Sequence, residues 1–301
     1  MCAQIPSDRA HPHEGYVPVD NAELFYREVG RGQPIILLHG GPDFDHIYFL
    51  PDMDRLSDSY RLIYYDQRGR RKSGHNVQPD DVTLQSEIED LEALRTFLQL
   101  DTAAILGHSW GGLMAMEYAL RHADRVSHLI LMNTAPASHD DYLVLREELR
   151  RRKAAYAEAI NALRSSTAYQ EGDPDAVVAY YRIHFSTTIR QPEHLDRLMA
   201  NMRLSFTKEG VLKGRAIEDR LYAETWLRSE YDLFPRLKEL RIPTLVIHGD
   251  YDFVPLEYAA HIAQTIPGAR FVVLKACGHF AYMESPDEVR KEFAQFFADQ
   301  S

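Results

Sequence analysis

The chain has few cysteines, and this scarcity excludes two kinds of protein. Only Cys2 and Cys277 occur among its 301 residues, so neither a disulfide framework nor a cysteine-based metal cluster is indicated. The sequence also contains no H-E-x-x-H motif and no paired C-x-x-C motif, which are spacings that zinc sites use. We therefore expect no metal site in this protein.

Long apolar runs are missing as well. The chain has no stretch of about twenty apolar residues that could span a bilayer. Its opening residues 1–9 lack the apolar core of a secretory signal. We therefore expect a cytoplasmic protein that does not bind a membrane.

Positive charge is scarce. The formal net charge of −11 argues against a nucleic-acid partner, because phosphates call for basic patches. Two dense basic runs, residues 68–72 and 150–153, stand out against this background, and each is expected to be a solvated face. The surplus of acid can favour a substrate that carries a cation, such as a free amine, although net charge acts first on solubility and steering. The oligomeric state stays open.

The rest of the composition is ordinary for a globular protein, with 45% apolar and 26% charged residues. Predicted strands alternate with helices through residue 135, a pattern typical of a parallel sheet covered on both faces. Strands are predicted at residues 34–38, 60–65, 103–106 and 126–132, and a helix is predicted at 84–98. The strand signal then stops for about a hundred residues and resumes at Thr244, with a further strand at 271–274.

A serine lies between two glycines where a predicted strand gives way to a predicted helix. The motif G-H-S-W-G, residues 107–111, is centred on Ser109 and precedes residues 113–120, whose apolar positions have helical spacing. Its glycines lack the Cβ atoms that would clash in a sharp turn, so Ser109 can sit strained and exposed at the helix start. The motif indicates a nucleophile. A plain connecting turn is the alternative, and the rest of the chain must decide.

An acyl-transfer serine needs a base, an acid that orients the base, and donors for the developing oxyanion. Asp250 and Asp252 follow a predicted strand at 242–248, at the sheet edge where open α/β folds keep their sites. Among fourteen histidines, only His279 combines a loop after a strand with the expected order of serine, acid and histidine. We predict that His279 is the base.

The loop after residues 34–38 is predicted to supply the oxyanion hole. Residues 39–42 read His-Gly-Gly-Pro, and glycines let backbone N–H groups approach a substrate oxygen closely. One donor is predicted to be the Gly41 N–H and the other the Trp110 N–H. This machinery needs no cofactor. Epoxide hydrolases and haloalkane dehalogenases use a carboxylate nucleophile, which forms an alkyl ester with the substrate. The serine at position 109 therefore argues against either chemistry.

Five short motifs together resemble an α/β-hydrolase of the proline iminopeptidase type. They are His-Gly-Gly-Pro at 39–42, Asp-Gln-Arg-Gly at 66–69, Gly-His-Ser-Trp-Gly-Gly at 107–112, Gly-Asp-Tyr-Asp at 249–252 and Gly-His at 278–279. The resemblance spans roughly residues 15 to 300. It implies that Ser109 is the nucleophile, Asp252 the triad acid and His279 the base.

The predicted architecture is an α/β-hydrolase fold, a mostly parallel sheet flanked by helices, with a helical cap inserted after the strand that follows the nucleophile helix. Residues 1–135 and 239–301 are predicted to form the core, and residues 136–238 the cap. Helical spacing at 140–164, 174–185 and 193–206 supports the insertion. A cap in this place would cover the site and shape its pocket.

Two departures from the resemblance concern the substrate. The family's loop continues with glycine after His-Gly-Gly-Pro, whereas this chain has Asp43, Phe44 and Asp45, which makes the mouth of the site bulkier and more acidic. The family also uses cap glutamates to hold a free amino terminus. The candidates here are Glu209, Glu218, Glu224 and Glu230.

Glu224 is favoured among these candidates because it lies between Tyr222 and Trp226. The predicted substrate-binding residues are Glu224, Asp43, Phe44 and Trp226. The cap is also rich in aromatic residues, most of which we expect to be packing residues and a minority to face the substrate.

Three functions stay open at this point. The first is an aminopeptidase that releases an N-terminal proline or another small residue. The second is a carboxylesterase for small or aryl esters that uses the same residues. The third is a ligand receptor of the hydrolase fold with slow turnover, which fold alone does not exclude. The complete triad and oxyanion loop favour an enzyme acting on a small ester or a short peptide.

Overall fold

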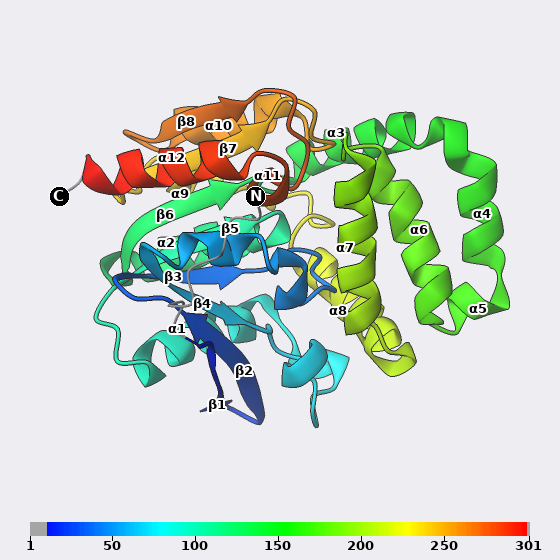
Figure 1. The fold of residues 1–301 in the computed structure, drawn as a ribbon, viewed down its shortest axis with the longest axis horizontal. Helices are drawn as coiled ribbons and strands as arrows, with labels where there is room; N and C mark the ends of the chain where they lie inside the picture. Colours follow the sequence, from blue (N-terminus) through cyan, green and yellow to red (C-terminus); the bar gives the residue numbers. More distant parts are fainter. Residues whose placement is uncertain (1–10, 300–301) are drawn as a thin grey trace, which may run out of the picture.

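The computed structural model describes residues 11–299, so Cys2 and the opening segment 1–9 lie outside the described residues. Within that range the chain forms an eight-stranded sheet in the order β1-β2-β4-β3-β5-β6-β7-β8 (Figure 1). The strands are β1 (His13–Val19), β2 (Ala22–Val29), β3 (Gln33–Leu38), β4 (Tyr60–Tyr65), β5 (Ala103–His108), β6 (Val126–Met132), β7 (Thr244–Gly249) and β8 (Arg270–Leu274).

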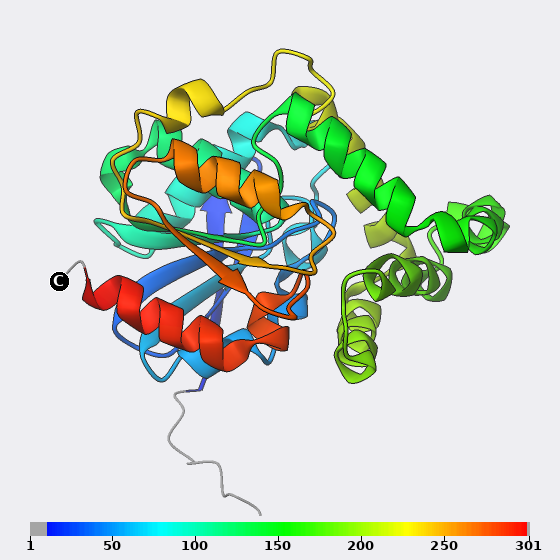
Figure 2. The ribbon, with the colours of Figure 1, turned by 90° about the horizontal axis from the view of Figure 1, so that it is seen from above.

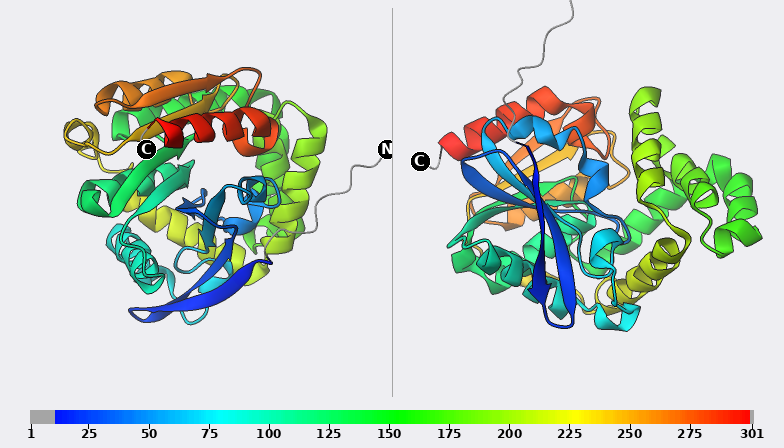
Figure 3. Two further views of the ribbon diagram at one scale, coloured as in Figure 1. Left: turned by 60° about the vertical axis from the view of Figure 1, so that its left-hand side comes forward. Right: turned by 60° about the horizontal axis from the view of Figure 1, so that its bottom comes forward.

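The sheet is mostly parallel, as predicted. β1 pairs with β2 and β2 with β4 in antiparallel fashion, and every pair from β4 to β8 is parallel. β5 and β7 are buried along their whole length, which explains why the central strands read as unbroken apolar runs instead of alternating. The β1–β2 hairpin, which the sequence analysis did not predict, lies at one edge of the molecule (Figure 3).

Helices cover both faces of the sheet, and the buried core lies between the sheet and the helices on each face. In Figure 2, α12 lies on one side of the sheet and α10 on the other. The helices outside the cap are α1 (Leu84–Phe97), α2 (Trp110–Arg121), α9 (Phe234–Leu237), α10 (Leu256–Thr265), α11 (Ala281–Glu284) and α12 (Pro286–Ala298). The short 3-10 turns among them are η1 (His46–Phe49), η2 (Met53–Leu56), η3 (Arg71–Ser73), η4 (Pro79–Asp81) and η5 (Ala123–Arg125).

Six further helices form a separate layer beside the sheet, on the right in Figure 1, and we call them the cap. They are α3 (His139–Arg152), α4 (Ala157–Ser165), α5 (Thr167–Gln170), α6 (Pro174–Ser186), α7 (Pro192–Ser205) and α8 (Lys208–Glu224). A 3-10 turn, η6 (Ala154–Tyr156), divides α3 from α4, so the helical signal at 140–164 is two helices and a corner.

Local sequence sets where the cap helices begin. Ser138 and Thr207 accept hydrogen bonds from the backbone of the first turns of α3 and α8, as good N-cap residues do. Asp173 caps α6 in the same way, and Pro174 follows at the first helical position, where its missing N–H costs nothing.

The strand register brings several loops to one edge of the sheet. Leu38 at the end of β3 lies opposite Gly107 of β5, and His108 lies opposite Met132 at the end of β6. β6 in turn places Met132 opposite Ile247 of β7. The segments that follow these strands therefore start from one edge, which is where parallel sheets hold their sites.

The expectation that residues 68–72 form a solvated face is wrong for two of the arginines. Arg68 and Arg70 are buried. Arg68 forms a two-pronged ion pair with Asp90, and Arg70 pairs with Glu87. A buried arginine is tolerated when a carboxylate pairs with its planar guanidinium group. The density of charged residues along the sequence does not reveal such partners, because they are distant in sequence. None of the helices in residues 11–299 is long and apolar enough to cross a membrane.

Candidate active site

Ser109 occupies the sharp turn between β5 and α2. Its backbone has φ 55° and ψ −123°, a region that residues other than glycine rarely adopt. A Cβ atom on Gly107 would lie 2.2 Å from the Gly111 carbonyl oxygen, and one on Gly111 would lie 2.1 Å from that of Leu38. Both positions therefore need glycine, because backbone fills the space that a side chain would take.

His279 and Asp252 form a buried pair in the loops after β8 and β7. The His279 Nδ1 atom lies 2.8 Å from Asp252 Oδ1 and 3.0 Å from Oδ2. Because an ionised carboxylate can only accept, the shared hydrogen is on Nδ1, which leaves Nε2 as a proton acceptor. Burial alone would raise the pKa of Asp252, but the nearby His279 and His248 lower it to about 2. Asp252 is therefore ionised at neutral pH.

Backbone and amide donors fix the Asp252 carboxylate. Val254 N–H donates to its Oδ1 at 3.0 Å, and Asn133 Nδ2 donates to its Oδ2 at 2.8 Å. The same Asn133 amide nitrogen also donates to the Gly278 carbonyl at 2.9 Å, so it links the acid loop to the histidine loop. Sequence reasoning missed Asn133. Its signal is a polar residue placed directly after the buried strand β6.

The structure also separates the two aspartates that follow β7. Asp250 is exposed, and its Oδ2 lies 3.8 Å from Lys275 Nζ. Asp252 is buried against His279. Of the two carboxylates, Asp252 is the one placed to orient an imidazole.

The predicted oxyanion loop lies against the serine. A Cβ atom on Gly40 would sit 2.9 Å from the Cβ of Ser109, so this loop and the elbow are in direct contact. Trp110 is the first residue of α2, and its N–H has no partner inside the helix. Within residues 11–299, neither the Gly41 nor the Trp110 amide donates a hydrogen bond to another protein group. Both are free to face a ligand.

One cavity of about 950 Å³ joins these groups. Core loops and cap helices line it together, as expected for a pocket covered by a lid. The predicted site residues on its wall are Gly41, Asp43, Phe44, Ser109, Trp110, Trp226 and His279. Asp252 lies behind His279.

Glu224 lies elsewhere, and this corrects the prediction that it binds substrate. Its Oε2 accepts a hydrogen bond of 2.7 Å from the Leu84 N–H at the start of α1, and its Oε1 lies 3.9 Å from Arg220. It is absent from the described residues that line the cavity. A carboxylate at the first turn of a helix satisfies free N–H groups there. The sequence prediction rested on the position of Glu224 between two aromatic residues. It could not reveal the contact with Leu84, which is far away in the sequence.

Glu218 and Asp43 are carboxylates on the cavity wall that form no ion pair among the described residues. Asp45 also lies on the wall, but it accepts from the Ile47 N–H and the Ser205 hydroxyl and lies 4.0 Å from Arg71. Burial, together with the charge of Asp43, raises the pKa of Glu218 to about 8. Burial also raises the pKa of Asp43, which accepts a hydrogen bond of 2.6 Å from the Tyr181 hydroxyl. A cation that entered here would let both groups ionise.

Most of the aromatic residues of the cap face the cavity, which corrects the expectation that most are packing residues. Phe44 extends this aromatic wall from the core, since its ring centroid lies 5.1 Å from that of Tyr181 and 6.2 Å from that of Phe185. Phe253 lies beside the histidine, with ring centroids 4.2 Å apart. The candidate site is therefore apolar and aromatic around a few buried charges.

A chain of buried hydrogen bonds connects the oxyanion loop with the histidine loop. The Gly40 N–H donates to the Tyr48 hydroxyl at 2.6 Å, and that hydroxyl lies 2.8 Å from His108 Nδ1. His108 Nε2 lies 2.8 Å from the His279 carbonyl oxygen. Because a carbonyl only accepts, the hydrogen is on Nε2, and Tyr48 must donate to Nδ1. Burial lowers the pKa of His108 to about 3, which agrees with this neutral form.

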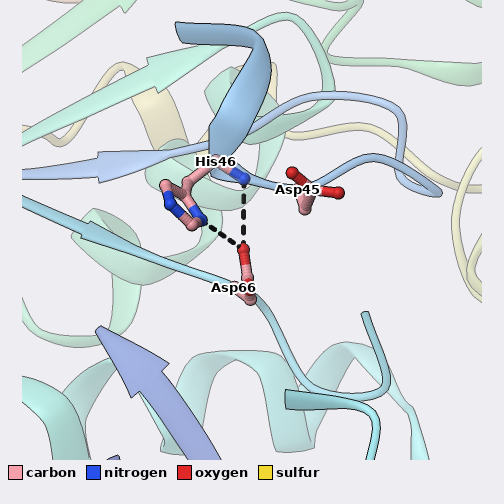
Figure 4. A group of neighbouring side chains, drawn as sticks. All are labelled: Asp45, His46 and Asp66. Carbon is pink, nitrogen blue, oxygen red and sulfur yellow. Dashed lines mark hydrogen bonds and ion pairs between the residues drawn. The ribbon is translucent and has the colours of Figure 1, made fainter. Parts of the chain in front are cut away.

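A second buried cluster, Asp45, His46 and Asp66, lies behind the oxyanion loop (Figure 4). Asp66 Oδ1 accepts from His46 Nδ1 at 2.6 Å and from the His46 N–H at 3.2 Å. Its Oδ2 accepts from the Lys72 N–H at 3.2 Å. Asp45 caps η1 by accepting from the Ile47 N–H. These protein donors account for the cluster, which ties the loop to the end of β4.

Comparison with known proteins identifies the class. A model of the alpha/beta hydrolase fold family matches residues 33–286 of this chain. That span is more than half of the sequence and contains the oxyanion loop, the elbow and the histidine loop. The chain belongs to the alpha/beta hydrolase fold family.

Individual relatives show which members of the family this chain is similar to. A proline iminopeptidase of Saccharolobus solfataricus is 28% identical over 291 residues, which cover 93% of this chain and 91% of that protein. The structure of a proline iminopeptidase of Mycobacterium smegmatis aligns with a TM-score of 0.70 and 23% identity, over 96% of this chain and 98% of that chain. A thermophilic esterase of Thermogutta terrifontis aligns with a TM-score of 0.70 and 24% identity, over 97% and 99%. The chain is thus similar to peptidases and esterases alike.

Proposed function

We propose that this chain is a serine hydrolase that cleaves small aminoacyl amides and short peptides from their amino terminus, through an acyl-enzyme. The observation that carries the proposal is the convergence of Ser109, His279 and two free backbone amides on one cavity that also holds two buried carboxylates. The named relatives include proline iminopeptidases that match nearly the whole chain, which supports the aminopeptidase side of the proposal.

The chemistry follows from the tautomer of the histidine. In this mechanism Ser109 attacks the carbonyl carbon while His279 Nε2 takes its proton, and Asp252 stabilises the imidazolium that forms. The Gly41 and Trp110 amides donate to the oxyanion. His279 then gives the proton to the leaving amine, and a water activated by the same nitrogen releases the acid from the serine.

Glu218 and Asp43 supply the preference for a free amine. A desolvated ammonium without a partner is costly, and these two carboxylates lie on the cavity wall without an ion-pair partner among the described residues. An ammonium between them would be paired twice and would offset both the burial and the repulsion by Asp43 that raise the pKa of Glu218. This charge pattern favours an aminoacyl substrate over an uncharged ester.

A matched set of substrates tests the proposal. We expect the enzyme to hydrolyse proline nitroanilide or another aminoacyl nitroanilide, and N-acetylation of the same compound to lower kcat/KM about a hundred-fold or more, because it removes the positive charge. The Ser109→Ala variant should lose turnover and keep the wild-type circular dichroism spectrum. Hydrolysis of nitrophenyl acetate with no hydrolysis of any aminoacyl anilide would contradict the aminopeptidase and favour an esterase.

A further inference from the structure

The same cavity carries positive charge that the proposed mechanism does not use. Lys153 lies between α3 and η6, Arg164 in α4 and Arg215 in α8, and all three line the cavity wall. Lys153 belongs to the basic run 150–153, for which we expected a solvated face. Arg150 and Arg151 meet that expectation, since both are exposed and pair with Glu147 and Glu148.

Lys153 differs from its neighbours in the run because it is partly buried and turned toward the cavity. Its Nζ lies 5.6 Å from the centroid of the Tyr180 ring. Within the described range, no carboxylate forms an ion pair with Lys153 or with Arg164. Burial, together with the charge of Arg164, lowers the pKa of Lys153 to about 8, as expected for an ammonium that lacks an anion.

Arg215 adds a further donor that forms no ion pair among the described residues, although its charge acts on Asp43 and Glu218. Its Nη1 donates to the Tyr169 carbonyl at 2.9 Å, and its guanidinium lies 4.1 Å from the centroid of the Tyr169 ring. Its Nη2 is buried and has no hydrogen-bond partner among the described residues. A buried donor that lacks a partner is costly unless a ligand meets it.

A series of contacts leads from Lys153 to the candidate histidine. The charge of Lys153 acts on His184, whose ring centroid lies 5.1 Å from that of Phe253. Phe253 in turn packs against His279. The next residue toward the helix, Arg152, donates to the Tyr251 carbonyl at 2.9 Å, so this corner of the cap touches the loop of the candidate acid.

The cavity wall thus carries the carboxylates Glu218 and Asp43 and the cations Lys153, Arg164 and Arg215, and the described residues form no ion pair between the two groups. The other pairs on the wall are Lys213 with Glu209 and Arg71 with Asp45. We propose that the cavity recognises a substrate with both charges, a short peptide with free termini, whose carboxylate is held by Lys153 with Arg164 beside it. This inference rests on the proposed aminopeptidase function, in which Glu218 and Asp43 hold the ammonium. The carboxylate belongs to the leaving peptide.

Peptides with a free or an amidated carboxyl end test the proposal. The probes are prolyl-alanine and prolyl-alanyl-alanine, each compared with its carboxyl amide. For one length or both, wild type should prefer the free acid about ten-fold or more in kcat/KM, because the acid gains an ion pair with the partly buried Lys153. Lys153→Met should bring the acid-to-amide ratio close to one, and Lys153→Arg should restore part of it. The exposed Arg151→Met, two residues earlier in the same basic run, is the control and should keep the wild-type ratio.

Binding to the Ser109→Ala variant separates the two proposals. Calorimetry should find the acid bound about ten-fold more tightly than the amide, whatever the rate of turnover. Equal affinities, together with equal hydrolysis of acid and amide by wild type, would overturn the carboxylate site and leave the aminopeptidase intact. Preferential binding of the acid with no hydrolysis by wild type would support the charge pattern and contradict the aminopeptidase. A ratio that survives Lys153→Met would overturn the role of Lys153.

Discussion

Asp252 and Asp250 are two residues apart and have opposite surroundings, which makes them a sharp test of the candidate triad. Asp252→Asn should lower kcat on the order of a thousand-fold, because an amide in its place favours the wrong tautomer of His279. Asp250→Asn removes only a surface contact with Lys275 and should change kcat by about two-fold at most. Steady-state kinetics on one aminoacyl anilide measures both. The reverse ranking would show that the acid has been misassigned.

Glu218 and Glu224 form a second matched pair, on one helix. Glu218→Gln should raise KM for an aminoacyl anilide about ten-fold or more, equivalent to roughly 1.4 kcal/mol, because the ammonium loses a buried partner. Glu224→Gln should leave KM within about two-fold, since its carboxylate faces the Leu84 N–H outside the cavity. KM and kcat measured for both variants decide. A larger effect at Glu224 would contradict the placement of the amine.

The candidate site residues that the sequence alone can indicate are those whose expected roles follow from position along the chain. Ser109 is marked by its two glycines, and His279 by its place after the last strand. Glu218, Lys153 and Asn133 could not be found in this way, because their importance depends on contacts between segments far apart in sequence. Four cap glutamates were equivalent by spacing, and only three-dimensional packing distinguishes Glu218 from Glu224.

At the scale of elements, the parallel strands were the most predictable part. β4 and β6 have the predicted limits, because they are buried on both faces and carry a continuous apolar signal. The β1–β2 hairpin was missed. Its strands are partly exposed and polar, so their pattern does not stand out from a loop. In the cap, the corner at η6 was hidden within a long helical signal, and this corner carries Lys153.

The contact between the histidine loop and the cap allows a prediction at this scale. A Cβ atom on Gly278 would lie 1.8 Å from the Thr188 carbonyl oxygen, so Gly278→Ala must push the His279 loop away from the cap. We expect a loss of about 1–3 kcal/mol in the free energy of unfolding and a fall of about a hundred-fold in kcat from misplacement of the imidazole.

Gly268→Ala is the control for this change. A Cβ there meets nothing within 4 Å, although φ is +76°, so about 1–2 kcal/mol of backbone strain is expected without loss of kcat. Urea unfolding and steady-state kinetics on both variants measure the effects. If Gly278→Ala kept full activity, the contact with Thr188 would not position the histidine.

At the scale of the whole molecule, the buried carboxylates of the cavity should make stability depend on pH. The pKa of Glu218 is raised from its usual 4.5 to about 8 by burial and by Asp43. Between these values the folded chain binds more protons than the unfolded chain, so stability falls as pH rises from about 4.5 to about 8. The protein therefore gives up stability at neutral pH to keep these groups in its cavity.

Glu218→Gln should remove part of this slope. The amide resembles the neutral carboxyl, so the variant should exceed wild type in stability by on the order of 1–3 kcal/mol at pH 8 and match it near pH 4.5. Urea unfolding at several pH values measures the difference. The exposed Glu239→Gln is the control and should follow wild type throughout. A Glu218→Gln curve parallel to wild type would contradict the link between the buried carboxyl and stability.

The central claim is that Ser109 is an activated nucleophile in this fold, and covalent labelling tests it most directly. A fluorophosphonate reacts with an activated serine, which forms a bond to phosphorus as fluoride leaves. Mass spectrometry of the intact chain, followed by peptide mapping, locates the label. We predict a single label on Ser109 in wild type and none in Ser109→Ala. A label on another residue, or a folded wild-type chain that takes up no label, would contradict the account.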